Sequence, residues 1–163
     1  MILLGLGANL PSPVGSPAET LRFALAKLAD SAIVPITTSN FYVTTAWPNP
    51  ADPDFVNAVA VIRTSLDPTM LLNQFHAIEE QLGRQRGASN APRTLDLDLL
   101  DYDGRIGAGP PQLPHPRMEK RGFVLLPLAE VAPAWRHPVT HRTVSELIMD
   151  LEAGQREVRL LRQ

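Results

Sequence analysis

Two aspartates separated by one residue, Asp96 and Asp98, have the type and spacing that most directly suggest chemistry in this sequence. Leu95, Leu97 and Leu99 alternate with this acid pair. Because side chains two residues apart on a β-strand project from the same face, the alternation predicts a strand with both carboxylates on one face and the leucines in the core. Carboxylates about 7 Å apart at Cα repel each other unless a cation lies between them, and Mg²⁺ takes such ligands together with water and phosphate oxygens. An amphipathic strand with a solvated acidic face would show the same pattern.

Basic residues gather around the acid pair. Residues 84–121 contain seven lysines and arginines, whereas residues 1–83 contain three. Arg84, Arg86 and Arg93 precede the aspartates, and guanidinium groups bind polyphosphate through several hydrogen bonds each. This charge pattern indicates a polyanion bound with a divalent metal, and a solvated loop is an equal alternative on charge alone. The sequence has no glycine-rich phosphate-binding loop that ends in Lys-Ser or Lys-Thr, so we expect side chains from loops to hold any nucleotide.

His115 lies between two prolines and is followed by Arg117, Lys120 and Arg121. The neighbouring cations favour a contact between this imidazole and a phosphate. A histidine with a purely structural role is the alternative.

Phe55 and Asn57 are two residues apart in an apolar, β-branched segment. On a strand they share one face, where an aromatic ring and an amide could stack on and hydrogen-bond to a flat heterocycle. The alternative is a core phenylalanine beside an asparagine at the strand edge.

The elements that must position these side chains follow the order strand, helix, strand, strand, helix, strand. Ser16 with Glu19 forms a capping box, and Asp67 precedes a proline, so both positions predict helix starts. The predicted elements are a strand over 1–10, a helix from 17, strands over 33–45 and 55–62, a helix over 68–82 and a strand over 95–102. This order predicts an α+β, ferredoxin-like βαββαβ core with a mostly antiparallel sheet and helices on one face.

The remaining residues predict loops and a C-terminal elaboration. Residues 84–94 and 104–116 lack helical or strand periodicity and are expected to be loops. A short helix over 116–120, an apolar segment over 123–131 and a capped helix from 143 to about 151 are expected after them.

Composition restricts the possible classes of protein. The chain has 163 residues and 44% hydrophobic residues, which predicts one globular domain over 1–163. There are no cysteines and no apolar run long enough to cross a membrane, so we expect no disulfide and no membrane partner. We expect a cytoplasmic monomer. The net charge of −2 and the 6% aromatic content argue against an RNA-binding protein of similar topology. They also argue against nucleic-acid partners in general.

Taken together, the sequence resembles the 6-hydroxymethyl-7,8-dihydropterin pyrophosphokinase family. The run Pro-Arg-Thr-Leu-Asp-Leu-Asp at 92–98 is highly specific to that family. The other matching segments are 5–10, 39–45, 54–58, 78–79, 83–86, 114–116 and 121–123, in the family's order along almost the whole chain.

The resemblance implies transfer of a pyrophosphoryl group from ATP to the pterin hydroxymethyl group, with release of AMP, in tetrahydrofolate biosynthesis. Asp96 and Asp98 would bind two Mg²⁺ ions along the triphosphate and, with Arg84 and Arg93, form the catalytic set. The residues implied to contact ATP are Glu79, Arg84, Arg93, His115 and Arg121. The residues implied to form the pterin pocket are Thr44, Phe55, Asn57 and Phe123, with the pterin between the two phenylalanine rings.

The loop 84–94 departs from the family pattern. The resemblance implies an arginine and a tryptophan over the bound ATP, but the matching residues here are Ser89 and Asn90. We therefore expect closure of the site to depend on the arginines at the two ends of the loop. The alternative function is a non-catalytic nucleotide- or pterin-binding regulatory module, which would have no need of both aspartates.

Overall fold

One six-stranded sheet forms the centre of the computed structural model, which describes residues 1–85 and 91–162. The strands are β1 (Ile2–Ala8), β2 (Val34–Thr38), β3 (Tyr42–Thr44), β4 (Phe55–Arg63), β5 (Asp96–Tyr102) and β6 (Val158–Leu160). They are arranged in the order β5-β1-β4-β3-β6, and β2 pairs with β4 beside β3. Every strand pairing within the described residues is antiparallel. The ferredoxin-like fold class is confirmed.

The prediction of a single strand over 33–45 is wrong, because this segment forms two strands, β2 and β3. Ser39 interrupts it: its side-chain hydroxyl accepts from the Val59 N–H at 3.1 Å, while its own N–H donates to the Val59 carbonyl at 2.9 Å. A serine hydroxyl thus takes the place of a backbone acceptor opposite β4. The chain restarts as β3, which carries Thr44 at its end.

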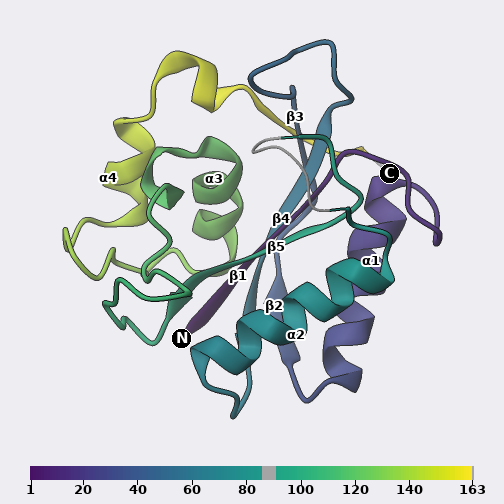
Figure 1. Cartoon of the computed structure of the whole chain (residues 1–163). Coiled ribbons are helices and arrows are strands. Elements are labelled where there is room, and N and C mark those ends of the chain that lie inside the picture. Colours follow the sequence, from purple (N-terminus) through teal and green to yellow (C-terminus); the bar gives the residue numbers. More distant parts are fainter. Residues whose placement is uncertain (86–90, 163) are drawn as a thin grey trace.

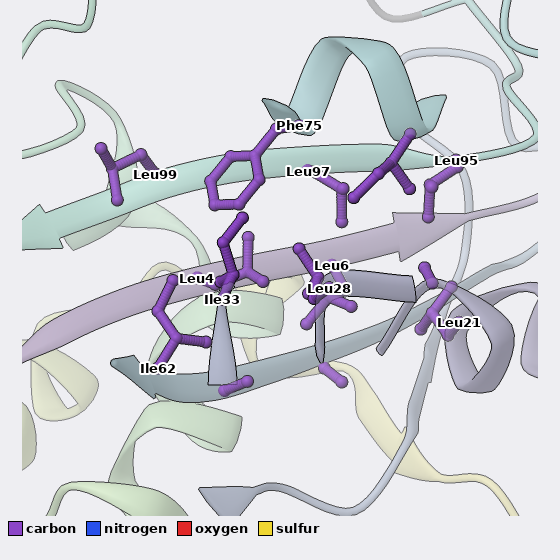
Figure 2. Close-up of a cluster of buried hydrophobic side chains, with 14 of the residues drawn as sticks. Leu4, Leu6, Leu21, Leu28, Ile33, Ile62, Phe75, Leu95, Leu97 and Leu99 are labelled. Atoms are coloured by element: carbon purple, nitrogen blue, oxygen red, sulfur yellow. The ribbon is translucent and has the colours of Figure 1, made fainter. Parts of the chain in front are cut away.

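Two helices, α1 (Pro17–Asp30) and α2 (Pro68–Gln81), cover one face of the sheet (Figure 1). Both begin where the sequence predicts: the Ser16–Glu19 capping box is formed, and Asp67 accepts from two backbone N–H groups. Figure 2 shows Phe75 of α2 between Leu97 and Leu99 of β5, with Leu21 and Leu28 of α1 in the same core.

The opposite face of the sheet is covered by the C-terminal part of the chain, so the expectation of helices on one face holds only for α1 and α2. Leu3, Val59 and Leu100 pack there against α3 (Gly122–Val131) and α4 (Val144–Met149). The predicted short helix is a single 3-10 turn, Met118–Lys120, and the apolar segment is α3.

A buried indole helps to fix this second layer. Trp135 donates from Nε1 to Asp101 of β5 at 2.7 Å, and Asp101 also accepts the Gly104 N–H. One oxygen of this buried carboxylate therefore holds the second layer to the sheet, and the other holds the turn after β5.

The last segment of the chain returns to the sheet. After α4, a 3-10 turn at Ala153–Arg156 leads into β6, which pairs with β3 (Figure 1). This strand was not predicted. No helix within the described residues is long and apolar enough to cross a bilayer.

Candidate active site

A cleft of about 1040 Å³ lies at the end of the sheet where β3 ends and β4 and β5 begin. It receives side chains from β3, β4, β5, α2 and α3, so both layers that cover the sheet contribute to it. The predicted site residues that line it are Thr44, Phe55, Asn57, Glu79, Arg84, Arg93, Asp96, Asp98, Arg121 and Phe123. His115 does not line the cleft, but its Nε2 lies 3.9 Å from an Asp98 oxygen.

The acid pair faces the cleft as the alternation predicts. Leu95, Leu97 and Leu99 are buried on the other side of β5. Asp96 is not freely solvated, because Arg84 donates to one carboxylate oxygen at 2.5 Å and Arg93 donates to the other at 2.8 Å. The two arginines come from opposite ends of the 84–94 loop and meet at a single carboxylate.

Asp98 is much less well neutralised than Asp96. Among the residues that the structure describes, its nearest cation is Arg121, whose Nη1 lies 3.6 Å from Oδ2, beyond hydrogen-bond distance. Desolvation in the cleft, reinforced by the Asp96 charge, raises the pKa of Asp98 to about 6, against the opposing pull of nearby arginines. This surplus of negative charge on Asp98 is what a bound cation would offset.

His115 is neutral at pH 7. Burial, together with Arg121 and Arg117, lowers its pKa to about 4. Its Nδ1 accepts the Arg117 N–H at 3.2 Å, so the ring proton sits on Nε2, the nitrogen nearer Asp98. The His115 ring can therefore donate a hydrogen bond to an anionic oxygen from Nε2.

Glu79 holds Arg84 in place at the floor of the cleft. This buried carboxylate, near the end of α2, accepts the Leu97 N–H at 2.7 Å and pairs with Arg84. Burial raises its pKa to about 7, against the Leu97 and Arg84 contacts that lower it. Arg84 thus lies between Glu79 and Asp96, which fixes its guanidinium at the floor of the cleft.

Asn9 is a residue of the site that the sequence reasoning missed. Its side-chain oxygen accepts the Arg93 N–H at 2.7 Å, its own N–H donates to the Arg93 carbonyl, and its Nδ2 donates to the Pro53 carbonyl at 3.0 Å. It is buried and fixes the backbone at Arg93. The signal available in the sequence was a polar residue directly after the apolar first strand.

An aromatic and amide surface forms the other end of the cleft. Asn57 donates to Thr44 Oγ1 at 3.0 Å, and Phe55, half-buried, lines the cleft rather than the core. Gly7 gives this amide room, since a Cβ there would stand 3.2 Å from Asn57 Oδ1. Phe123 approaches from the N-terminus of α3.

Arginines connect the two ends of the cleft. The Arg93 guanidinium lies 5.9 Å from the centre of the Phe55 ring, and Arg121 lies 5.4 Å from that of Phe123. Each cation is attracted to the ring face and is held beside the acid pair at the same time.

Several further residues line the cleft. Arg117 and Lys120 belong to the cationic stretch seen in the sequence, and Trp47, 70% exposed, lies in the loop between β3 and β4. The others that sequence reasoning missed include His76, Gln85, Glu152, Gln155, Glu157 and Val158. His76 is three residues before Glu79 on α2, a spacing that could have indicated it. Arg86, Ser89 and Asn90 lie outside the described residues.

An acid pair flanked by arginines, facing a cleft with an aromatic end, is suited to binding a polyphosphate and a flat aromatic group side by side. The sequence model of the 7,8-dihydro-6-hydroxymethylpterin-pyrophosphokinase family matches residues 3–133. The chain belongs to this family.

Curated relatives carry the same function in their names. The 2-amino-4-hydroxy-6-hydroxymethyldihydropteridine pyrophosphokinase of Synechocystis sp. is 39% identical over 152 residues, which cover 92% of this chain and 75% of the relative. The Haemophilus influenzae protein of the same name is 40% identical over 130 residues, 79% of each chain. A crystal structure of Plasmodium falciparum HPPK-DHPS superposes with a TM-score of 0.67 at 16% identity, covering 90% of this chain and 40% of that longer one, and shows the shared fold.

Proposed function

We propose that this chain transfers a pyrophosphoryl group from ATP to the hydroxymethyl oxygen of 6-hydroxymethyl-7,8-dihydropterin, releasing AMP, as a step of tetrahydrofolate biosynthesis. Family membership supports the reaction. The observation that carries the assignment is a single cleft with the acid pair and its arginines at one end and Phe55, Asn57 and Phe123 at the other. Donor and acceptor binding surfaces therefore lie within one cavity.

The nucleotide occupies the cationic end in this proposal. Arg84, Arg93 and Arg121 already point at carboxylates, and the same guanidinium groups bind phosphate oxygens when the nucleotide enters. His115 donates from Nε2 to a phosphate oxygen, and Glu79 holds Arg84 in place.

The acid pair fits Mg²⁺. Carboxylate oxygens are hard ligands, and Mg²⁺ in proteins commonly takes one or two of them with water and substrate phosphates. No group of three or more His, Cys, Asp or Glu side chains suited to a metal occurs among the described residues, so the remaining ligands come from ATP and water. Asp96 and Asp98 would hold the two ions proposed here. When bound, Mg²⁺ supplies neutralisation of the charge that develops on the transferred phosphates.

The pterin occupies the aromatic end. Its flat ring lies between Phe55 and Phe123, and the Asn57 amide, fixed by Thr44, hydrogen-bonds to its edge. This places the hydroxymethyl group toward the acid pair.

The transfer balances as a displacement at the β-phosphorus of ATP. The hydroxymethyl oxygen forms a bond to that phosphorus, the bond to the oxygen bridging the α- and β-phosphates breaks, and the hydroxyl proton is released. Reactions of this kind depend on in-line positioning and charge stabilisation more than on covalent help from the protein. The arginines position the chain of phosphates, and the aromatic pair positions the acceptor.

Product analysis tests the proposal. The chain is incubated with ATP, Mg²⁺ and the hydroxymethyl pterin, and nucleotides are resolved. AMP is expected; ADP would mean transfer of a single phosphoryl group, and no turnover would favour the regulatory module. Asp98→Asn is the matched inactive control.

The proposal includes a monomer acting in the cytoplasm, where ATP is available. All of the side chains assigned here come from one chain, so the site does not require a partner subunit.

A further inference from the structure

The segment 152–158 lines the substrate cleft although it lies beyond residues 3–133, which the family model matches. Glu152, Gln155, Glu157 and Val158 all contribute to the wall. Nothing in the mechanism above uses them. Their position next to the aromatic end of the cleft therefore needs a functional explanation.

One attachment of the segment is to the strand that carries Thr44. β6 pairs antiparallel with β3, and Val158 is the register partner of Thr44. The pairing continues beyond the strand, where the Leu161 N–H donates to the Phe41 carbonyl at 2.8 Å. β3 is only three residues long, so β6 provides its second edge and restrains Thr44, the hydrogen-bond partner of Asn57.

A second attachment is to the start of α3. Gly122 lies so close to Gln155 that an added Cβ would stand 1.6 Å from its carbonyl oxygen and 2.8 Å from its carbonyl carbon. Atoms that are not bonded to each other do not approach so closely, so only glycine allows this contact. The next residue is Phe123. The backbone of the segment is thus seated against the residue that sets the position of the Phe123 ring.

The segment is also held in shape internally. Arg156 donates from Nε to the Leu151 carbonyl at 2.9 Å and from Nη2 to the Met149 carbonyl at 2.5 Å. These two bonds tie the 3-10 turn to the end of α4, which packs against α3. The segment is therefore a strap fixed at α4, braced on Gly122 and paired to β3.

We infer that the strap, residues 152–158, is a positioning element of the pterin site, holding Phe123 and Thr44 at the spacing that the heterocycle requires. The inference rests on the proposed function for the identity of the ligand. It assigns the strap to acceptor binding, because the strap lies against Gly122, which precedes Phe123, and pairs with Thr44 of β3.

Steady-state kinetics of Gly122→Ala test the inference. The added methyl group must displace the strap from α3. KM for the pterin is therefore expected to rise about 5- to 30-fold, which is the effect expected when one packing contact is lost. KM for ATP is expected to rise several-fold less than KM for the pterin, although Gly122 directly follows Arg121. Gly109→Ala is the matched control, because Gly109 has open space around it and lies away from the cleft, and it is expected to match the unmodified chain.

Arg156→Ala provides a second variant that loosens the strap without a steric clash. It is expected to raise KM for the pterin in the same direction with an unchanged midpoint of thermal unfolding, and it decides the question if Gly122→Ala does not fold. Unchanged KM for the pterin, or equal rises for pterin and ATP, would overturn the inference. Failure of the unmodified chain to form AMP would instead overturn the proposed function, and the inference with it.

Discussion

Asp98 is expected to contribute to activity at a cost to stability. Its carboxylate lies in the cleft beside Asp96, and no cation of residues 1–85 or 91–162 is within hydrogen-bond distance of it. In metal-free protein the repulsion between the two aspartates is only partly offset. Because Asp98 is partly exposed to solvent, the free energy of this repulsion is small. Asp98→Asn is therefore expected to raise the free energy of unfolding by up to about 1 kcal/mol at pH 7.5 with chelator present.

The same substitution is expected to lower turnover at least about 100-fold, because charge stabilisation at the transferred phosphates is lost. Urea unfolding and AMP formation measure the two effects on one sample. Asp96→Asn is the informative comparison, since it removes one acceptor oxygen and the negative charge that both arginines contact, and it should lower stability. A fall in stability for Asp98→Asn would show that the described contacts miss a partner of this residue.

Glu79 is expected to behave in the opposite way, as a residue on which the fold depends. Glu79→Ala leaves the Leu97 N–H without its acceptor and Arg84 without its buried partner. The free energy of unfolding is expected to fall by about 3 kcal/mol in urea titrations.

Its neighbour Glu80 is exposed and provides the control, because Glu80→Ala should leave stability nearly unchanged. Equal effects of the two substitutions would contradict the structural role given to Glu79.

At this scale the sequence predicted the acid pair and the arginines that line the cleft, but it placed His115 there too and did not show how the side chains are paired. Asp96 and Asp98 follow from the two-residue period of a strand, which is local information. The bridge from Glu79 through Arg84 to Asp96 depends on the end of α2 lying over the start of β5. That approach is a consequence of packing, and no spacing along the chain encodes it.

Among the elements, those with local end signals were predicted and those without them were not. The capping box at Ser16 and the Asp67 cap fixed the starts of α1 and α2. β6 is three residues long and exists because β3 offers it a free edge, so its own sequence carries little signal. α3 is apolar on nearly every side and contains Pro127, which hides the helical period.

The turn at 137–141 gives an element-scale prediction about pH. His137 is buried, and burial lowers its pKa against the raising effect of Glu119 and Asp101. Its Nδ1 accepts the N–H groups of Val139 and Thr140, at 3.3 and 3.2 Å, and protonation would remove both bonds. The unfolded chain takes up a proton near pH 6.5 that the folded chain resists, so the free energy of unfolding is expected to fall as pH falls below about 6.5.

Urea titrations at pH 7.5 and pH 5 test this dependence. His137→Asn keeps an acceptor near the position of Nδ1 but does not titrate, so it should reduce the loss of stability at pH 5. His141→Asn, an exposed substitution in the same turn, should leave that loss in place. Identical losses in the unmodified chain and His137→Asn would refute the role of this histidine.

For the molecule as a whole, the site exists because the sheet is covered on both faces. α2 brings Glu79 from one layer and α3 brings Phe123 from the other, and they meet at one end of the sheet. The sequence order predicted the first layer, since βαββαβ units place their helices together. It left the second layer unplaced, because the face used by α3 and α4 is decided by where Leu3, Val59 and Leu100 project.

The two tryptophans differ in their exposure to solvent, so the intrinsic fluorescence of the chain can report ligand binding. Trp47 stands 70% exposed at the cleft, while Trp135 is 6% exposed with its indole N–H bonded to Asp101. Their emission spectra should differ, with Trp47 giving the red-shifted component that an aqueous quencher such as acrylamide removes first. Occupation of the aromatic end should shield that component alone, so the fluorescence change on adding pterin with a non-hydrolysable ATP analogue should disappear in Trp47→Phe. A change that survives this substitution would mean that binding is felt at Trp135, across the sheet from α1 and α2.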